Sequence, residues 1–71
     1  MNGKEVERLE TYLKKKFMLD SIELRQRPGA DDSAEVYIGD EFIGLLFRDD
    51  EDGDLSYSFQ MAILDFDLDE M

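Results

Sequence analysis

Carboxylate side chains crowd one short segment of this chain, and carboxylates are the groups from which calcium sites and some catalytic sites are built. The segment separates two apolar runs and carries a single glycine, Gly53. Its acids are Asp49, Asp50, Glu51, Asp52 and Asp54. Three interpretations compete for this segment: a calcium loop, a docking loop for a basic partner, and a solvated hairpin turn.

The calcium interpretation fails at the ligand positions. An EF-hand loop needs an oxygen ligand at its first position, glycine at its sixth and glutamate at its twelfth. With Gly53 as the sixth residue, the first is Arg48 and the twelfth is Phe59. We therefore expect a hydrated turn whose Asp-Gly pair supplies the backbone geometry, with no dedicated metal site. Weak divalent-metal binding is the lesser alternative.

Other catalytic chemistry has little support in the sequence. Nucleophilic triads and proton shuttles usually depend on His or Cys, and the chain contains neither. The close acid pairs Asp31–Asp32 and Asp49–Asp50 fall in expected exposed turns, away from the burial that tunes a catalytic carboxylate. No glycine-rich phosphate-binding motif occurs. We expect a protein that is not an enzyme and uses no cofactor.

Charge is the strongest compositional signal, because 19 acids and 8 bases give a net charge of −11. The distribution is uneven, with a net charge of +2 over residues 1–27 and −13 over residues 28–71. Such a chain repels phosphate backbones, so we expect no direct nucleic-acid binding. The run Lys14 to Lys16 suits the C-terminal end of a helix dipole better than a lipid or RNA site.

Location is predicted from what the sequence lacks. No apolar run approaches the roughly 20 residues that span a bilayer, and the first residues do not have the pattern of a signal peptide. The absence of Cys fits a reducing compartment. We expect a cytoplasmic protein that does not contact membranes.

The spacing of apolar residues predicts one helix and four strands. Asn2 and Glu5 resemble a helix-capping pair, and apolar residues recur after them at helical spacing, predicting a helix over 4–17. Alternation and turn signals predict strands over 21–27, 33–38, 41–48 and 55–64, a loop over 28–32 and an acidic tail over 65–71. Short connections favour a meander. The prediction is one α+β domain, with an N-terminal helix packed on one face of a four-stranded antiparallel meander sheet.

Strand register decides which side chains face the helix. A two-residue turn at Gly39-Asp40 pairs Tyr37 with Phe42, Val36 with Ile43 and Ala34 with Leu45. The predicted inner face, which the helix covers, consists of Ile22, Leu24, Val36, Ile38, Ile43, Leu45, Phe47, Leu55, Tyr57, Phe59, Met61 and Ile63.

Three large apolar residues fall on the predicted outer face: Tyr37, Phe42 and Leu46. Gly44, between the last two, leaves a gap for a partner side chain. The alternatives to an interface are that the tail residues Phe66 and Leu68 cover this patch or that it is merely exposed. All five residues form the predicted partner interface, with a second copy as one possible partner.

The segment Leu64 to Glu70 alternates apolar and acidic residues on the opposite parity from the strand before it. A frayed edge strand, a bulge that ends the strand, and an acidic docking peptide that leaves the sheet are the three alternatives.

Residues 31–68 carry a resemblance to a known family. The stretches VYIGDEFIG and FQMAILD are its most specific parts. They resemble a domain-of-unknown-function family of short acidic alphaproteobacterial proteins, and the similarity includes the opening helix. The resemblance implies a bacterial, cytoplasmic protein and supplies no activity, cofactor or functional residue.

Two functions of different kinds follow. The first is a non-enzymatic protein-binding or self-associating module, suggested by the apolar character of both faces of the strand over 41–48. The second is an acidic mimic of nucleic acid that binds a basic protein surface through the acidic loop and the C-terminal acids. Binding that tolerates salt favours the first, and binding that salt abolishes favours the second.

Overall fold

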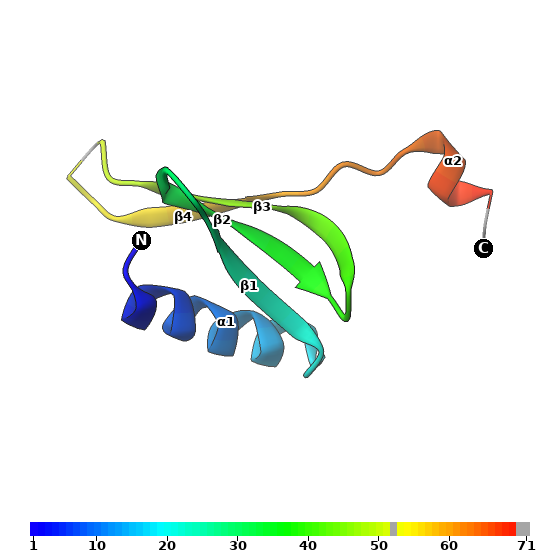
Figure 1. Cartoon of the computed structure of the whole chain (residues 1–71), viewed down its shortest axis with the longest axis horizontal. Coiled ribbons are helices and arrows are strands. Elements are labelled where there is room, and N and C mark those ends of the chain that lie inside the picture. Colours follow the sequence, from blue (N-terminus) through cyan, green and yellow to red (C-terminus); the bar gives the residue numbers. More distant parts are fainter. Residues whose placement is uncertain (52, 70–71) are drawn as a thin grey trace.

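The computed structural model describes residues 1–51 and 53–69 and confirms the predicted α+β fold (Figure 1). The elements, in chain order, are helix α1 (Gly3–Phe17), strands β1 (Ile22–Arg27), β2 (Ala30–Ile38), β3 (Glu41–Asp49) and β4 (Ser56–Gln60), and the short helix α2 (Asp65–Leu68). The strands form one antiparallel sheet in sequential order. Helix α1 lies on one face of this sheet, and β1 is its main contact.

Helix α1 begins and ends as its sequence predicts. The Asn2 Oδ1 atom accepts a hydrogen bond from the Glu5 backbone N–H at 2.7 Å, which caps the first turn. Met18 ends the helix in the left-handed conformation, with a φ of 52°. The three lysines before it lie in the last turn, where positive charge offsets the helix dipole.

Two strand boundaries differ from the predicted ones by more than one residue. Strand β2 begins at Ala30 rather than at residue 33, because Pro28 and Gly29 make a tight turn that pairs Arg27 with Ala30. Gly29 has a φ of 77°, which suits glycine, so the predicted loop over 28–32 shrinks to this turn. Strand β4 ends at Gln60 rather than at residue 64.

A β-bulge between β2 and β3 changes the register. Beside the turn, Tyr37 pairs with Phe42 as predicted. Beyond it, Val36 pairs with Gly44 and not with Ile43, which is therefore the extra residue of the bulge. The predicted Val36–Ile43 pairing was wrong, because the turn sequence alone gives no sign of a bulge three residues further on.

The bulge reverses the faces of the rest of β3. Leu46 pairs with Ala34 and is only 3% exposed, so it belongs to the core and not to the predicted outer patch. Leu45 and Phe47 move in the opposite sense, from the predicted inner face to the outer face. Because side chains alternate along a strand, one inserted residue is enough to cause all three errors.

The core is small and lies where α1 crosses β1. Its buried apolar residues are Leu13, Ile22, Leu24, Ala34, Val36 and Leu46. Gly44 is also buried, and a Cβ atom there would lie 2.3 Å from the Gln60 carbonyl oxygen and 2.9 Å from the Phe59 ring. The predicted gap at Gly44 is thus wrong, because β4 fills that space.

After β4 the chain leaves the body of the protein. Residues 61–69, called here the C-terminal arm, run past the β2–β3 hairpin to α2, which lies at the far end of the molecule from the start of α1 (Figure 1). The Leu64 N–H donates to the Asp67 carboxylate at 3.0 Å, which fixes the start of α2. The predicted strand over 61–64 was wrong, and the tail leaves the sheet. Glu70 and Met71 lie outside the described residues.

Over the described residues, neither helix has the length and apolar character that crossing a membrane requires.

Candidate functional site

An apolar groove of about 480 Å³ lies beside α1 on the inner face of the sheet. It exists because α1 packs mainly against β1 and leaves the β3–β4 half of that face partly uncovered. The groove, as named here, is lined by Leu9, Tyr12 and Leu13 of α1, by Leu46 of β3, and by Leu55, Tyr57 and Phe59 in or beside β4, with Glu5 and Arg8 as its charged residues. Three of these nine residues are aromatic.

Glu5 ties α1 to β3 and β4 at the groove. Its Oε2 atom lies 3.0 Å from the Arg48 Nε atom and accepts a hydrogen bond from the Tyr57 hydroxyl. The hydrogen bond from Tyr57, followed by the charge of Arg48, lowers the pKa of Glu5, although partial burial opposes this shift. The same hydrogen bond raises the pKa of Tyr57. Sequence reasoning assigned Glu5 only to the helix cap, since no local pattern connects it to residues so distant in the chain.

The α1 side of the groove is basic. Arg8 lines both the groove and an adjoining hollow of about 270 Å³. Lys4 and Arg48 also line that hollow, together with Glu5, which is already paired with Arg48. An anionic group that approached from this side would therefore meet Arg8 and Lys4.

The outer sheet face carries part of the predicted interface. Tyr37 and Phe42 meet edge to face, with ring centroids 5.7 Å apart, and Phe42 is 49% exposed. The Arg25 guanidinium lies 3.8 Å from the centroid of the Tyr37 ring. Leu46 is absent from this patch, as the register requires. Phe66 and Leu68 are 67% and 59% exposed, so neither packs on this patch, although Leu64 and Asp67 line a hollow of about 520 Å³ together with Phe42.

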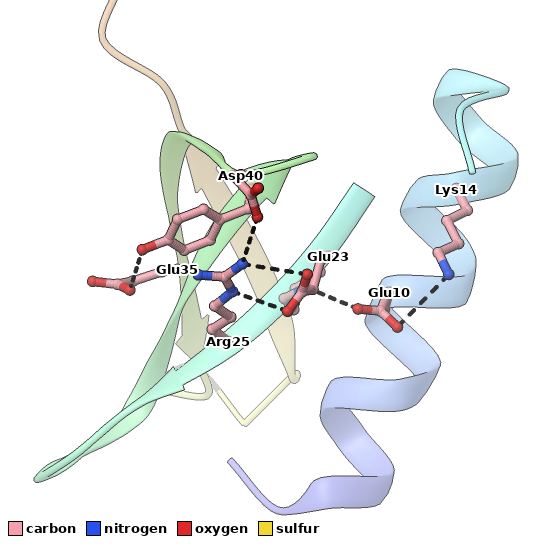
Figure 2. Close-up of polar contacts among 8 residues, drawn as sticks. Glu10, Lys14, Glu23, Arg25, Glu35 and Asp40 are labelled. Carbon is pink, nitrogen blue, oxygen red and sulfur yellow. Dashed lines mark hydrogen bonds and ion pairs between the residues drawn. The ribbon is translucent and has the colours of Figure 1, made fainter. Parts of the chain in front are cut away.

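Charged side chains surround this outer patch (Figure 2). The Arg25 Nε atom lies 2.9 Å from Glu23 and its Nη2 atom lies 3.7 Å from Asp40. The hydrogen bond between Arg25 and Glu23 lowers the pKa of Glu23 and raises that of Arg25. The Tyr37 hydroxyl donates to Glu35 at 3.0 Å. Two carboxylates thus pair with the Arg25 guanidinium and a third accepts from the Tyr37 hydroxyl, so the surroundings of the patch are acidic.

The acidic loop forms a turn in the residues that the structure describes. The Glu51 N–H donates to Asp49 Oδ1 at 3.1 Å, and the Gly53 N–H donates to the Asp50 carbonyl at 3.3 Å. Gly53 has a φ of 84°, which is the conformation expected of the Asp-Gly pair. Asp49, Asp50, Glu51 and Asp54 are exposed, whereas Asp52 lies outside the described residues. In residues 1–51 and 53–69, no three acidic side chains are placed to hold a metal ion.

The comparisons with known proteins give one family and no individual relative. No curated protein and no solved structure matches the chain. A family model described as "Protein of unknown function (DUF3126)" matches residues 5–67, which extend from the first turn of α1 into α2. The predicted resemblance to a domain-of-unknown-function family is therefore confirmed. Since the match covers most of the chain, the protein belongs to the DUF3126 family of proteins of unknown function.

Proposed function

We propose that this protein is a non-enzymatic protein-binding module and that the groove beside α1 is its binding site. The groove carries the proposal, because it leaves large apolar side chains of α1 and β4 open to a partner. The surface area of the chain agrees with it. A compact monomer of 8.3 kDa exposes about 4,600 Å². This chain exposes 5637 Å². The excess is about 1,000 Å², similar to the roughly 800 Å² that each partner buries in a standard interface.

The residue types in the groove support the same function. Tyr12 is 58% exposed and Leu55 is 51% exposed, so two of its large side chains are available to a partner. Aromatic and arginine side chains, here Tyr12, Tyr57 and Arg8, are enriched among residues that dominate binding energy. Each large apolar side chain that becomes fully buried stabilises a complex by about 1.5–3 kcal/mol before association costs.

Affinity purification from the source cells with matched variants tests the proposal. Tyr12→Asp places a charge in the groove and Phe42→Glu places one on the outer face, and both side chains are exposed enough for the domain to remain folded by circular dichroism. We expect the wild type and Phe42→Glu to retain the same protein at high salt, and Tyr12→Asp to lose it. Retention that Tyr12→Asp leaves unchanged would contradict the assignment of the groove.

The acidic mimic is the second candidate, and one observation favours it. The described acids of the loop after β3 are exposed, within a half of the chain whose net charge is −13. A partner held in this way should dissociate at high salt and should be lost when Asp49, Asp50 and Glu51 are replaced by Asn, Asn and Gln. Tyr12→Asp should leave its binding unchanged, which separates the two functions.

A further inference from the structure

The C-terminal arm has the composition that suits the groove. We propose that the groove of one copy binds the arm of a second copy, so that two chains exchange arms in a homodimer. This inference rests on the proposed function of the groove and names its occupant.

The arm is an apolar segment whose large side chains stay mostly exposed in its own chain, although its first half lines an open hollow with residues 41–45 of β3. Five of its side chains are more than half exposed: Met61, Ile63, Leu64, Phe66 and Leu68. Large contiguous apolar surfaces on small proteins usually mark interaction sites. Among residues 1–51 and 53–69, the arm accounts for five of the ten large apolar residues that are exposed, and Tyr12 and Leu55 of the groove are two of the others.

Charge distinguishes the groove from the outer patch as the place where an arm docks. The arm carries acids at Asp65, Asp67 and Asp69 between and after its apolar residues. Arg8 and Lys4 lie at the groove and its adjoining hollow, so the acids of an incoming arm meet positive charge there. The outer patch instead presents carboxylates around Arg25, which is already paired with Glu23 and Asp40.

The direction of the arm favours a second copy over its own chain. The arm continues from the end of β4 and carries α2 away from the start of α1 (Figure 1). The groove residues Leu55, Tyr57 and Phe59 come before the arm in the chain, so the arm runs away from the groove of its own chain. To fill its own groove the chain would have to reverse within residues 61–64. That segment is Met-Ala-Ile-Leu and contains neither Gly nor Pro, the residues that favour sharp reversals.

Reciprocal exchange also gives a closed assembly of suitable size. When each of two chains donates an arm and receives one, the contact is isologous and the dimer closes without further growth. The excess area of about 1,000 Å² per chain is what one partner of a standard interface buries. Exchange would therefore bring the exposed surface of each chain close to that of a compact protein of its size.

Paramagnetic labelling between chains tests the arm position directly. Because the chain has no Cys, Asp69→Cys provides one site for a nitroxide at the end of the arm. Labelled Asp69→Cys chains without ¹⁵N are mixed with ¹⁵N-labelled wild type. We expect selective broadening of the Leu9, Tyr12 and Tyr57 amides in the ¹⁵N chain. Absence of broadening, or broadening centred on Tyr37 and Phe42, would overturn the proposal.

A dilution experiment separates exchange from closure within one chain. Here the nitroxide and ¹⁵N are on the same Asp69→Cys chain, diluted into excess unlabelled wild type. If arms exchange, broadening of the groove amides disappears, because the labelled groove now holds a wild-type arm. Broadening that persists at full strength would mean that each arm fills its own groove, and would overturn the exchange.

Sedimentation equilibrium measures how strongly the two chains associate. Phe66→Ser with Leu68→Ser in the arm, and Tyr12→Asp in the groove, should each weaken dimerisation at least tenfold, whereas Phe42→Glu on the outer face should leave it unchanged. A strictly monomeric wild type overturns the inference. If that monomer still retains a foreign protein through Tyr12, the proposed function stands. If it retains none, both fail.

Discussion

Glu5 has two separate roles, one for its backbone and one for its side chain. Its backbone N–H completes the cap of α1, while its carboxylate contacts Arg48 of β3 and Tyr57 of β4. Arg48 is the one base among residues 28–71, so the most acidic part of the chain is joined to the helix through its single positive side chain. The helix and the far half of the sheet are thus held together by a charge-assisted contact beside a small core.

Glu5→Gln should lower the free energy of unfolding at pH 7 by about 1–2 kcal/mol, since it removes the charge from these hydrogen bonds and keeps the cap. The pKa of Glu5 is lower in the folded chain than its ordinary value of 4.5, so its stabilising contribution is complete above that pH and is lost as the pH falls through the folded pKa. Urea unfolding at several pH values checks this.

The difference between wild type and Glu5→Gln should shrink steadily below pH 4.5. Tyr57→Phe is the matched control, because it removes the hydroxyl and leaves the Glu5–Arg48 ion pair. An equally large difference between wild type and Glu5→Gln at pH 7 and in strong acid would mean that the carboxylate charge has no part in the stability.

Among the elements, β4 packs closely against β3 only because residue 44 of β3 is a glycine. Gly44→Ala should destabilise the protein by about 1–3 kcal/mol, because the new Cβ would overlap the backbone of β4 at Gln60. Urea unfolding measures the loss, and hydrogen exchange should show it first in the amides of β4. Gly3→Ala is the control, since nothing lies within 4 Å of a Cβ there. Unchanged stability in Gly44→Ala would place β4 further from β3.

The acidic loop should respond to calcium only as a hydrated turn does. We expect millimolar calcium to shift NMR signals in residues 49–54 slightly and to leave the groove unchanged, because Arg48 and Phe59 stand where an EF-hand has ligands. A titration followed by ¹⁵N–¹H spectra checks this. A micromolar dissociation constant would contradict it.

The sequence was sufficient for α1 and for the order of the four strands, and insufficient for the end of β4, for helix α2 and for the faces of β3. Helical spacing, the Asn2 cap and the turn glycines give α1, the hairpins and the strand order, because these signals are local. Leu46 was misplaced because a bulge at Ile43 is set by how β3 meets β2 and β4, not by its own residue type. The groove was missed for a similar reason, since its walls come from α1 and β4, which are distant in the sequence. The sequence predicted that the helix covers one face of the sheet, but not which strands of that face it leaves uncovered.

Across the whole molecule, repulsion among acids should set the response to salt. With a net charge of −11, the melting temperature should rise between about 0.01 M and about 0.15 M sodium chloride, over which the Debye length falls from about 30 Å to about 8 Å. A gain of about 1 kcal/mol corresponds to roughly 4–8 °C for a domain of this size. Calorimetry at low protein concentration checks this, and a steady fall would show that attractive pairs outweigh the repulsion.

The two edges of the sheet differ in a way that bears on uncontrolled polymerisation. At β1, the outward Leu24 N–H already donates to Glu10 Oε1 at 2.8 Å, and Lys14 lies 3.9 Å from the same carboxylate (Figure 2). At the other end of the sheet, β4 carries no such helix side chain along its ladder among the described contacts. Amyloid-like growth by strand addition needs two receptive edges on every subunit. A sheet with one guarded edge can pair through the other edge and then stop, so we expect the Glu10 contact to disfavour fibre growth in a protein with an exposed apolar arm.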